Sequence, residues 1–97
     1  MITKDDIIKA IRDFKQEIER RYKVKSIGLF GSFIRGVQKE DSDIDFLVDF
    51  EEGADLIDLI ELEFFLTEKF NRKVEVVPRR TLKKELKEFI LREVAYI

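Results

Sequence analysis

Residues 29–50 read LFGSFIRGVQKEDSDIDFLVDF, two apolar runs separated by a polar loop. The second run alternates acidic and apolar residues, which is the period of a half-buried strand. Residues 44–50 are therefore predicted to form a strand whose apolar side chains share one face. Asp43, Asp45 and Asp49 share the other face, although like charges crowded on one face repel each other. This crowding indicates that the aspartates serve a purpose other than folding.

Working outward, hydrophobic spacing and breaker residues divide the rest of the chain into helices and strands. The predicted elements are helix 5–22, strand 25–30, one helical turn at 33–36, strand 44–50, helix 55–70, strand 73–77 and helix 81–94. The order α-β-β-α-β-α predicts an α/β (α+β) fold, in which helices pack on a small three-stranded mixed sheet.

Two threonines are predicted to begin helices. Thr3 caps the first helix, with Asp6 as its partner in a shortened capping box. Thr81 caps the last helix, which is predicted to turn four apolar side chains inward: Leu82, Leu86, Phe89 and Ile90. The helix over residues 55–70 is apolar on much of its surface, which indicates burial on more than one side or a partner surface. Core burial is the preferred interpretation.

The composition excludes several classes of site. A chain of 97 residues predicts one domain spanning residues 1–97. The 19 basic and 21 acidic side chains leave a net charge of −2, which gives no strong field to favour direct binding of nucleic acid. Without His or Cys, acid–base or metal chemistry has to use carboxylates, Lys, Tyr or water. No targeting segment or apolar run of about 18 residues is present, so we expect a cytoplasmic protein without a membrane partner.

Asp43 and Asp45 stand two residues apart on the predicted strand, so their carboxylates lie within several ångströms of each other. Two carboxylates that close raise each other's pKa, whereas a divalent cation between them reverses this penalty. Mg²⁺ prefers one or two carboxylates with water and substrate phosphates, and two such ions clamp the attacking and leaving oxygens of a phosphoryl transfer. Glu75 is predicted to join this face, as a third ligand and catalytic carboxylate, if residues 73–77 pair beside residues 44–50. Its role would be to orient or deprotonate the incoming nucleophile.

Gly31-Ser32 supplies a candidate phosphate site. A strand that ends in Gly-Ser and turns into a helix presents unpaired backbone N–H groups and a hydroxyl. Gly31 also lets the backbone approach a ligand closely. Arg35 follows on the same turn and is predicted to add a bidentate phosphate contact. Together with the aspartates, these residues predict a site for a metal-bound nucleoside triphosphate.

The aspartates also fit the start of a calcium loop, because Asp41, Asp43 and Asp45 have the opening spacing of an EF-hand. Such a loop needs glycine at its sixth position for a sharp turn, and Phe46 stands there. The residues that follow are strand-like, so the calcium loop is rejected.

The segment GSFIRGVQKEDSDID resembles the Gly-Ser, ten residues, Asp-x-Asp pattern of the nucleotidyltransferase superfamily, whose catalytic core resembles that of DNA polymerase beta. The short length, the Arg-Gly of FIRG and the serine before the first aspartate are similar to the minimal nucleotidyltransferases, which prokaryotes pair with HEPN-domain ribonuclease toxins. The resemblance covers nearly the whole chain. It implies a nucleotidyltransferase-like fold in which Gly31 and Ser32 bind triphosphate, while Asp43 and Asp45 bind Mg²⁺. It also implies that ATP donates AMP, that pyrophosphate leaves, and that the acceptor is a hydroxyl, for instance of a tyrosine on the toxin.

Three functions stay open. The first is an enzyme that silences a partner toxin by Mg²⁺-dependent AMP transfer. The second is an antitoxin that binds nucleotide but acts by contact, because the third carboxylate of the family is commonly Asp and Glu75 is longer by one C–C bond of ~1.5 Å. The third is a transferase for a small molecule or an RNA end, for which 97 residues leave little room to hold the acceptor. Whether the chain forms a homo- or hetero-oligomer is open as well.

Overall fold

The computed structural model describes residues 2–97, and its centre is a four-stranded mixed sheet in the order β3-β2-β1-β4. The strands are β1 Val24–Phe30, β2 Ile44–Phe50, β3 Val74–Pro78 and β4 Ala95–Tyr96. β1 runs antiparallel to β2 and β4, whereas β2 and β3 are parallel. The predicted mixed sheet is confirmed, but the predicted number of three strands is wrong. β4 has only 2 residues, too few for an alternating pattern to be visible in the sequence.

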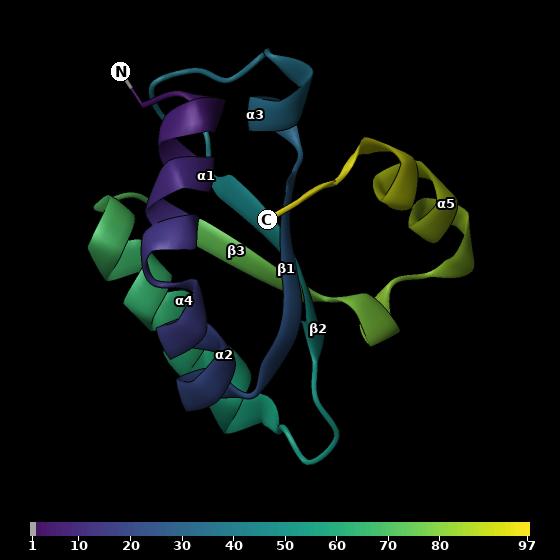
Figure 1. The fold of residues 1–97 in the computed structure, drawn as a ribbon. Helices are drawn as coiled ribbons and strands as arrows, with labels where there is room; N and C mark the ends of the chain where they lie inside the picture. Colours follow the sequence, from purple (N-terminus) through teal and green to yellow (C-terminus); the bar gives the residue numbers. More distant parts are fainter. Residues whose placement is uncertain (1) are drawn as a thin grey trace.

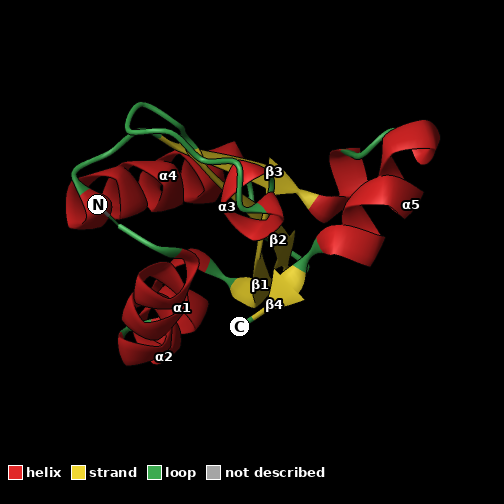
Figure 2. Cartoon of the chain, turned by 90° about the horizontal axis from the view of Figure 1, so that it is seen from above, coloured by secondary structure: helices red, strands yellow, loops and turns green. Residues whose placement is uncertain are grey.

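Helices lie on both sides of this sheet. They are α1 Lys4–Asp13, α2 Lys15–Tyr22, α3 Ser32–Arg35, α4 Leu56–Phe70 and α5 Lys84–Glu93, with a 3₁₀ turn η1 at Arg79–Thr81. Figure 1 shows α1, α2 and α4 on one side of the strands and α5 on the other, and the view from above in Figure 2 shows the same separation. The core fills the space between the sheet and α1, α2 and α4, and its fully buried members include Ile7, Ile11, Ile18, Ile27, Leu29, Ile44, Phe46, Val48, Leu62 and Leu66. None of the helices between residues 2 and 97 is long and apolar enough to span a bilayer.

The first predicted helix is interrupted at Phe14. Its start is confirmed, since the Thr3 hydroxyl accepts from the Asp6 amide and the Asp6 carboxylate accepts from the Thr3 amide. At Phe14 the backbone leaves helical geometry (φ −121°, ψ 24°), and its N–H donates to the carbonyl of Ile11. The Phe14 ring packs edge-on against Phe65 of α4, with 5.6 Å between ring centroids. Hydrophobic spacing does not reveal such a break, because the apolar face continues across it.

The last helix differs most from its prediction. Thr81 does not cap it, because the Thr81 hydroxyl donates to the Pro78 carbonyl at 2.8 Å within the 3₁₀ turn, and α5 begins after that turn. Leu86 and Phe89, predicted to face inward, are 53% and 57% exposed. The helix stands away from the sheet (Figure 2), and Ile90 is its one buried residue. The inward prediction for Leu86 and Phe89 is therefore wrong.

α4 is buried on one side only. Asp55 and Asp58 form its capping box, and its buried residues are Leu62 and Leu66. Four other apolar side chains are 58–72% exposed, and they are Leu56, Ile57, Ile60 and Phe64. The expected core burial thus holds for one side of α4, while these four residues form an apolar surface on the other.

Candidate functional site

Sheet pairing brings the predicted carboxylates to one place. β2 and β3 are parallel neighbours with Asp45 opposite Glu75, which confirms the predicted pairing of these strands. Ile44 and Phe46 flank Asp45 and are fully buried in the core, so Asp45 points to the opposite face of the sheet. Asp43 lies two residues earlier, directly before β2, and its side chain is 37% exposed. The three carboxylates therefore lie on the face of the sheet away from α1, α2 and α4.

Gly31 lies directly against Asp45. Phe30 ends β1 opposite Asp45, so the Gly31-Ser32 turn leads into α3 beside the carboxylates. Gly31 has φ 85°, a conformation that residues with a Cβ rarely adopt. A Cβ at this position would also collide with Oδ2 of Asp45. The predicted turn from strand into helix is confirmed, and glycine is required there for two separate reasons.

The surroundings of Asp45 disfavour its charged form. Its pKa is raised to about 6, first by burial, then by the charges of Glu75 and Asp43 and by a hydrogen bond with Glu75, while Arg35 acts in the lowering direction. A divalent cation between the two aspartates would remove this penalty, and two carboxylates completed by phosphate oxygens suit Mg²⁺. Among residues 2–97, no three acidic side chains are arranged to hold a metal ion by themselves. Glu75 as a third metal ligand stays a prediction.

We expect Asp45→Asn to stabilise the metal-free protein at pH 8 and to leave its stability unchanged near pH 3. The pKa of Asp45 is about 6 in the folded state against an ordinary value of 3.8, so the folded state binds more protons between these values. The free energy of unfolding of the wild type therefore falls as the pH rises from about 4 to about 6, and the variant lacks this fall. Thermal unfolding in the presence of a chelator measures this pH dependence of the stability. Asp49→Asn, which lies on the same face of the strand, is the control. An identical pH dependence in all three proteins would contradict this.

Arg35, predicted as a phosphate ligand, pairs with a carboxylate that no sequence pattern indicates. Its guanidinium donates to one oxygen of Glu93 at 2.8 Å, and the other oxygen of Glu93 accepts from the Gly31 amide at 2.8 Å. Glu93 ends α5, and its side chain is only 10% exposed. It lies 62 residues from Gly31 along the chain, so only the folded structure reveals the contact.

A second residue that sequence patterns miss is Arg72, which lies between α4 and β3. Its guanidinium donates to the Ser42 carbonyl at 2.9 Å and lies over the Phe33 ring, 5.6 Å from the ring centroid. The Ser42 hydroxyl accepts from the Lys39 amide at 2.7 Å. These contacts hold the loop that leads into Asp43 against α3.

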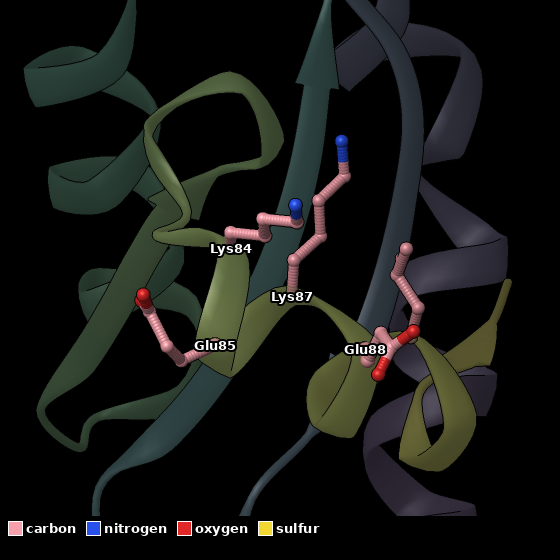
Figure 3. Close-up of a pocket in the computed structure, with 5 residues that line it drawn as sticks. Lys84, Glu85, Lys87 and Glu88 are labelled. Carbon is pink, nitrogen blue, oxygen red and sulfur yellow. The ribbon is translucent and has the colours of Figure 1, made fainter.

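The surface hollow shown in Figure 3 lies elsewhere. It is lined by five residues of α5, namely Lys84, Glu85, Lys87, Glu88 and Leu91. Its lysines and glutamates are exposed, and none of the predicted site residues lines it. The candidate site is therefore not this hollow but the group of predicted residues around the Gly31 turn and the carboxylates, namely Gly31, Ser32, Arg35, Asp43, Asp45 and Glu75.

Known proteins resemble the chain over most of its length. The profile of the nucleotidyltransferase domain family matches residues 11–97. Protein adenylyltransferase MntA of Thermococcus cleftensis is 42% identical over 97 residues, which are 100% of this chain and 98% of that protein. A solved structure assigned to a minimal nucleotidyltransferase has a TM-score of 0.80 at 36% identity, covering 93% of this chain and 92% of that one. A crystal structure of a toxin–antitoxin with AMP-PNP has a TM-score of 0.71 at 27% identity, covering 87% of this chain and 69% of that one.

Proposed function

The chain belongs to the nucleotidyltransferase domain family, and we propose that it transfers AMP from ATP to a hydroxyl group of a partner protein, with Mg²⁺. The observation that carries the proposal is the position of Asp45, which lies against Gly31 and opposite Glu75. Asp45, a proposed metal ligand, thus lies against the Gly31-Ser32 turn, which is proposed to bind the phosphates. It also neighbours Glu75, which is proposed to receive the proton of the acceptor hydroxyl. The proposal assigns the whole site to one domain spanning residues 1–97.

Each residue has a proposed role in the transfer. Ser32 would hold the triphosphate through its backbone N–H and its hydroxyl, and Gly31 would let the backbone approach the phosphates closely. Asp43 and Asp45 would hold Mg²⁺, whose charge when bound neutralises the phosphates and the departing pyrophosphate. The acceptor oxygen forms a bond to the α-phosphorus while the bond from that phosphorus to the bridging oxygen breaks, and pyrophosphate leaves. Glu75 takes the proton of the acceptor hydroxyl.

The proposed partner is a HEPN-type toxin, which this chain would silence as the antitoxin of the pair. Two relatives support this proposal. The 42% identical protein is a protein adenylyltransferase, and the 27% identical structure is a toxin–antitoxin with AMP-PNP. AMP-PNP is an ATP analogue, which favours ATP as the donor of AMP.

A second candidate is an antitoxin that acts by contact without transferring AMP. The observation that favours it is the apolar surface of α4, formed by Leu56, Ile57, Ile60 and Phe64. Glu75, which replaces the more common aspartate of the family, favours it as well. Neutralisation of the toxin by a variant that lacks both Asp43 and Asp45 would select this second candidate.

Incubating the chain and its partner with ATP labelled at either the α- or the γ-phosphate tests the proposal. Label on the partner is expected from α-labelled ATP only, and only when Mg²⁺ is present. Label from the γ-phosphate would mean phosphoryl transfer instead of AMP transfer. Absence of label from both, with folded partner present, would contradict the proposal.

Glu75→Gln is expected to slow AMP transfer by about 100-fold or more, since glutamine keeps the size of glutamate but cannot accept the proton. Its affinity for AMP-PNP should stay within about twofold of the wild type, because the proposed role belongs to the transition state. Glu75→Asp, which restores the usual residue of the family, is the matched variant and should retain transfer. Initial rates at saturating ATP measure both variants, and an unchanged rate for Glu75→Gln would contradict the role of base.

A further inference from the structure

Glu93 joins the C-terminal helix to two residues of the candidate site. One of its carboxylate oxygens accepts from the Gly31 amide and the other from the Arg35 guanidinium, both at 2.8 Å. Its side chain is 10% exposed, whereas Glu85 and Glu88 of the same helix are exposed to solvent. In the part of the chain from residue 2 to 97, these are the only side-chain hydrogen bonds between α5 and the other elements. The C-terminal helix is thus tied to the site through one carboxylate.

Glu93 leaves free the donors that a phosphate would use. It takes the N–H of Gly31, while the first amides of α3, at Ser32 and Phe33, have no acceptor within that short helix. It takes one terminal nitrogen of Arg35, and a guanidinium has five N–H groups. The carboxylate therefore fixes the backbone turn and the guanidinium without occupying all of their donors.

The position of the Arg35 guanidinium matters because other anions lie near it. Gly31, whose amide shares the Glu93 carboxylate with Arg35, lies directly against Asp45. Without Glu93, the guanidinium would be free to pair with this aspartate, which is a proposed Mg²⁺ ligand. The Glu93 contact instead pairs the positive charge with a carboxylate that also accepts from the Gly31 amide, beside the turn proposed to bind the phosphates.

We propose that Glu93 is a positioning residue, which holds Arg35 and the Gly31-Ser32 turn in the orientation that binds the phosphates of a nucleoside triphosphate. This inference rests on the proposed function and extends the site to the C-terminal helix. Glu93 does not touch the substrate and acts through Arg35 and the Gly31 backbone.

The dissociation constant of Mg²⁺–AMP-PNP, measured by titration calorimetry on the full chain, tests this role. Glu93→Gln keeps an acceptor for the Gly31 amide but removes the charge opposite Arg35, and it is expected to weaken binding about tenfold. Glu93→Ala loses both contacts and is expected to weaken binding further. Glu88→Ala removes an exposed carboxylate of the same helix, and as the matched control it should bind like the wild type.

A double-mutant cycle with Arg35→Ala separates positioning from general damage to the fold. In the Arg35→Ala background, Glu93→Gln is expected to change the dissociation constant by less than about twofold, because the group through which it acts is absent. A tenfold loss in both backgrounds would overturn the inference, since it would mean a structural role alone. Binding by Glu93→Gln as tight as, or tighter than, the wild type would also overturn it, since the carboxylate would then compete with the phosphates.

Failure of the proposed function has a different signature. A wild type that binds AMP-PNP with the expected dependence on Glu93, yet transfers no AMP to the partner, would overturn AMP transfer and uphold the positioning role. A wild type that binds no AMP-PNP would overturn both.

Discussion

The Asp43→Asn, Asp45→Asn double variant is expected to transfer AMP at least about 1000-fold more slowly than the wild type. Asparagine keeps the shape of aspartate but lacks the charge with which the site would hold Mg²⁺. Without the cation, the charge that develops on the phosphates is not neutralised and pyrophosphate leaves slowly. The rate of label transfer from α-labelled ATP to the partner, at fixed Mg²⁺, measures the effect.

Asp49→Asn is the matched control for this variant. Asp49 lies on the same face of β2 but pairs with Ser26, four residues and roughly 13 Å along the strand from Asp45. It should keep the wild-type rate. The double variant should remain folded, because the substitution removes the free-energy cost of the charged form of Asp45. Thermal unfolding verifies that it is folded. AMP transfer that persists in the folded double variant would contradict the assignment of the two aspartates.

Gly31→Ala is expected to abolish measurable AMP-PNP binding and to lower the free energy of unfolding by about 1–3 kcal/mol. The alanine would be held at φ 85°, and its Cβ would collide with Oδ2 of Asp45. Because the turn and the carboxylate cannot both keep their positions, the groups proposed to hold the phosphates and the metal ion would move apart. Calorimetric titration and thermal unfolding measure the two effects.

Gly36→Ala separates backbone strain from this collision. Gly36 ends α3 with φ 74°, but nothing lies within 4 Å of a Cβ built there. Its alanine variant should lose a similar amount of stability and yet bind AMP-PNP far better than Gly31→Ala. Equal loss of binding in both variants would mean that the contact between Gly31 and Asp45 is not what the site requires.

Strong local patterns made much of this molecule predictable from its sequence. β2 spans Ile44–Phe50, the residues predicted to form a strand from the alternation of acidic and apolar side chains, and α1 begins at the capping box of Thr3 and Asp6. The candidate site could be proposed from the sequence because three of its parts, Gly31, Asp43 and Asp45, lie within residues 31–45. Glu75 required one further step, the pairing of two strands, and the parallel register with Asp45 confirms it.

The features that escaped prediction depend on contacts between distant parts of the chain. The periodic apolar residues of α5 predicted a packed helix, but Leu86 and Phe89 are exposed because the helix stands away from the sheet. β4 exists through its pairing with Gly28 and Leu29, and has no pattern of its own. Glu93 is one of several glutamates in a charged helix, and only its position at the end of that helix brings it to Gly31.

The intact mass of the partner protein, after incubation with this chain, Mg²⁺ and ATP, tests AMP transfer most directly. With the wild type, the mass of the partner is predicted to rise by one or more adenylyl groups. With the Asp43→Asn, Asp45→Asn variant, it is predicted to stay unchanged. A partner that the wild type neutralises without any change in mass would contradict AMP transfer and would mean that the chain acts by contact.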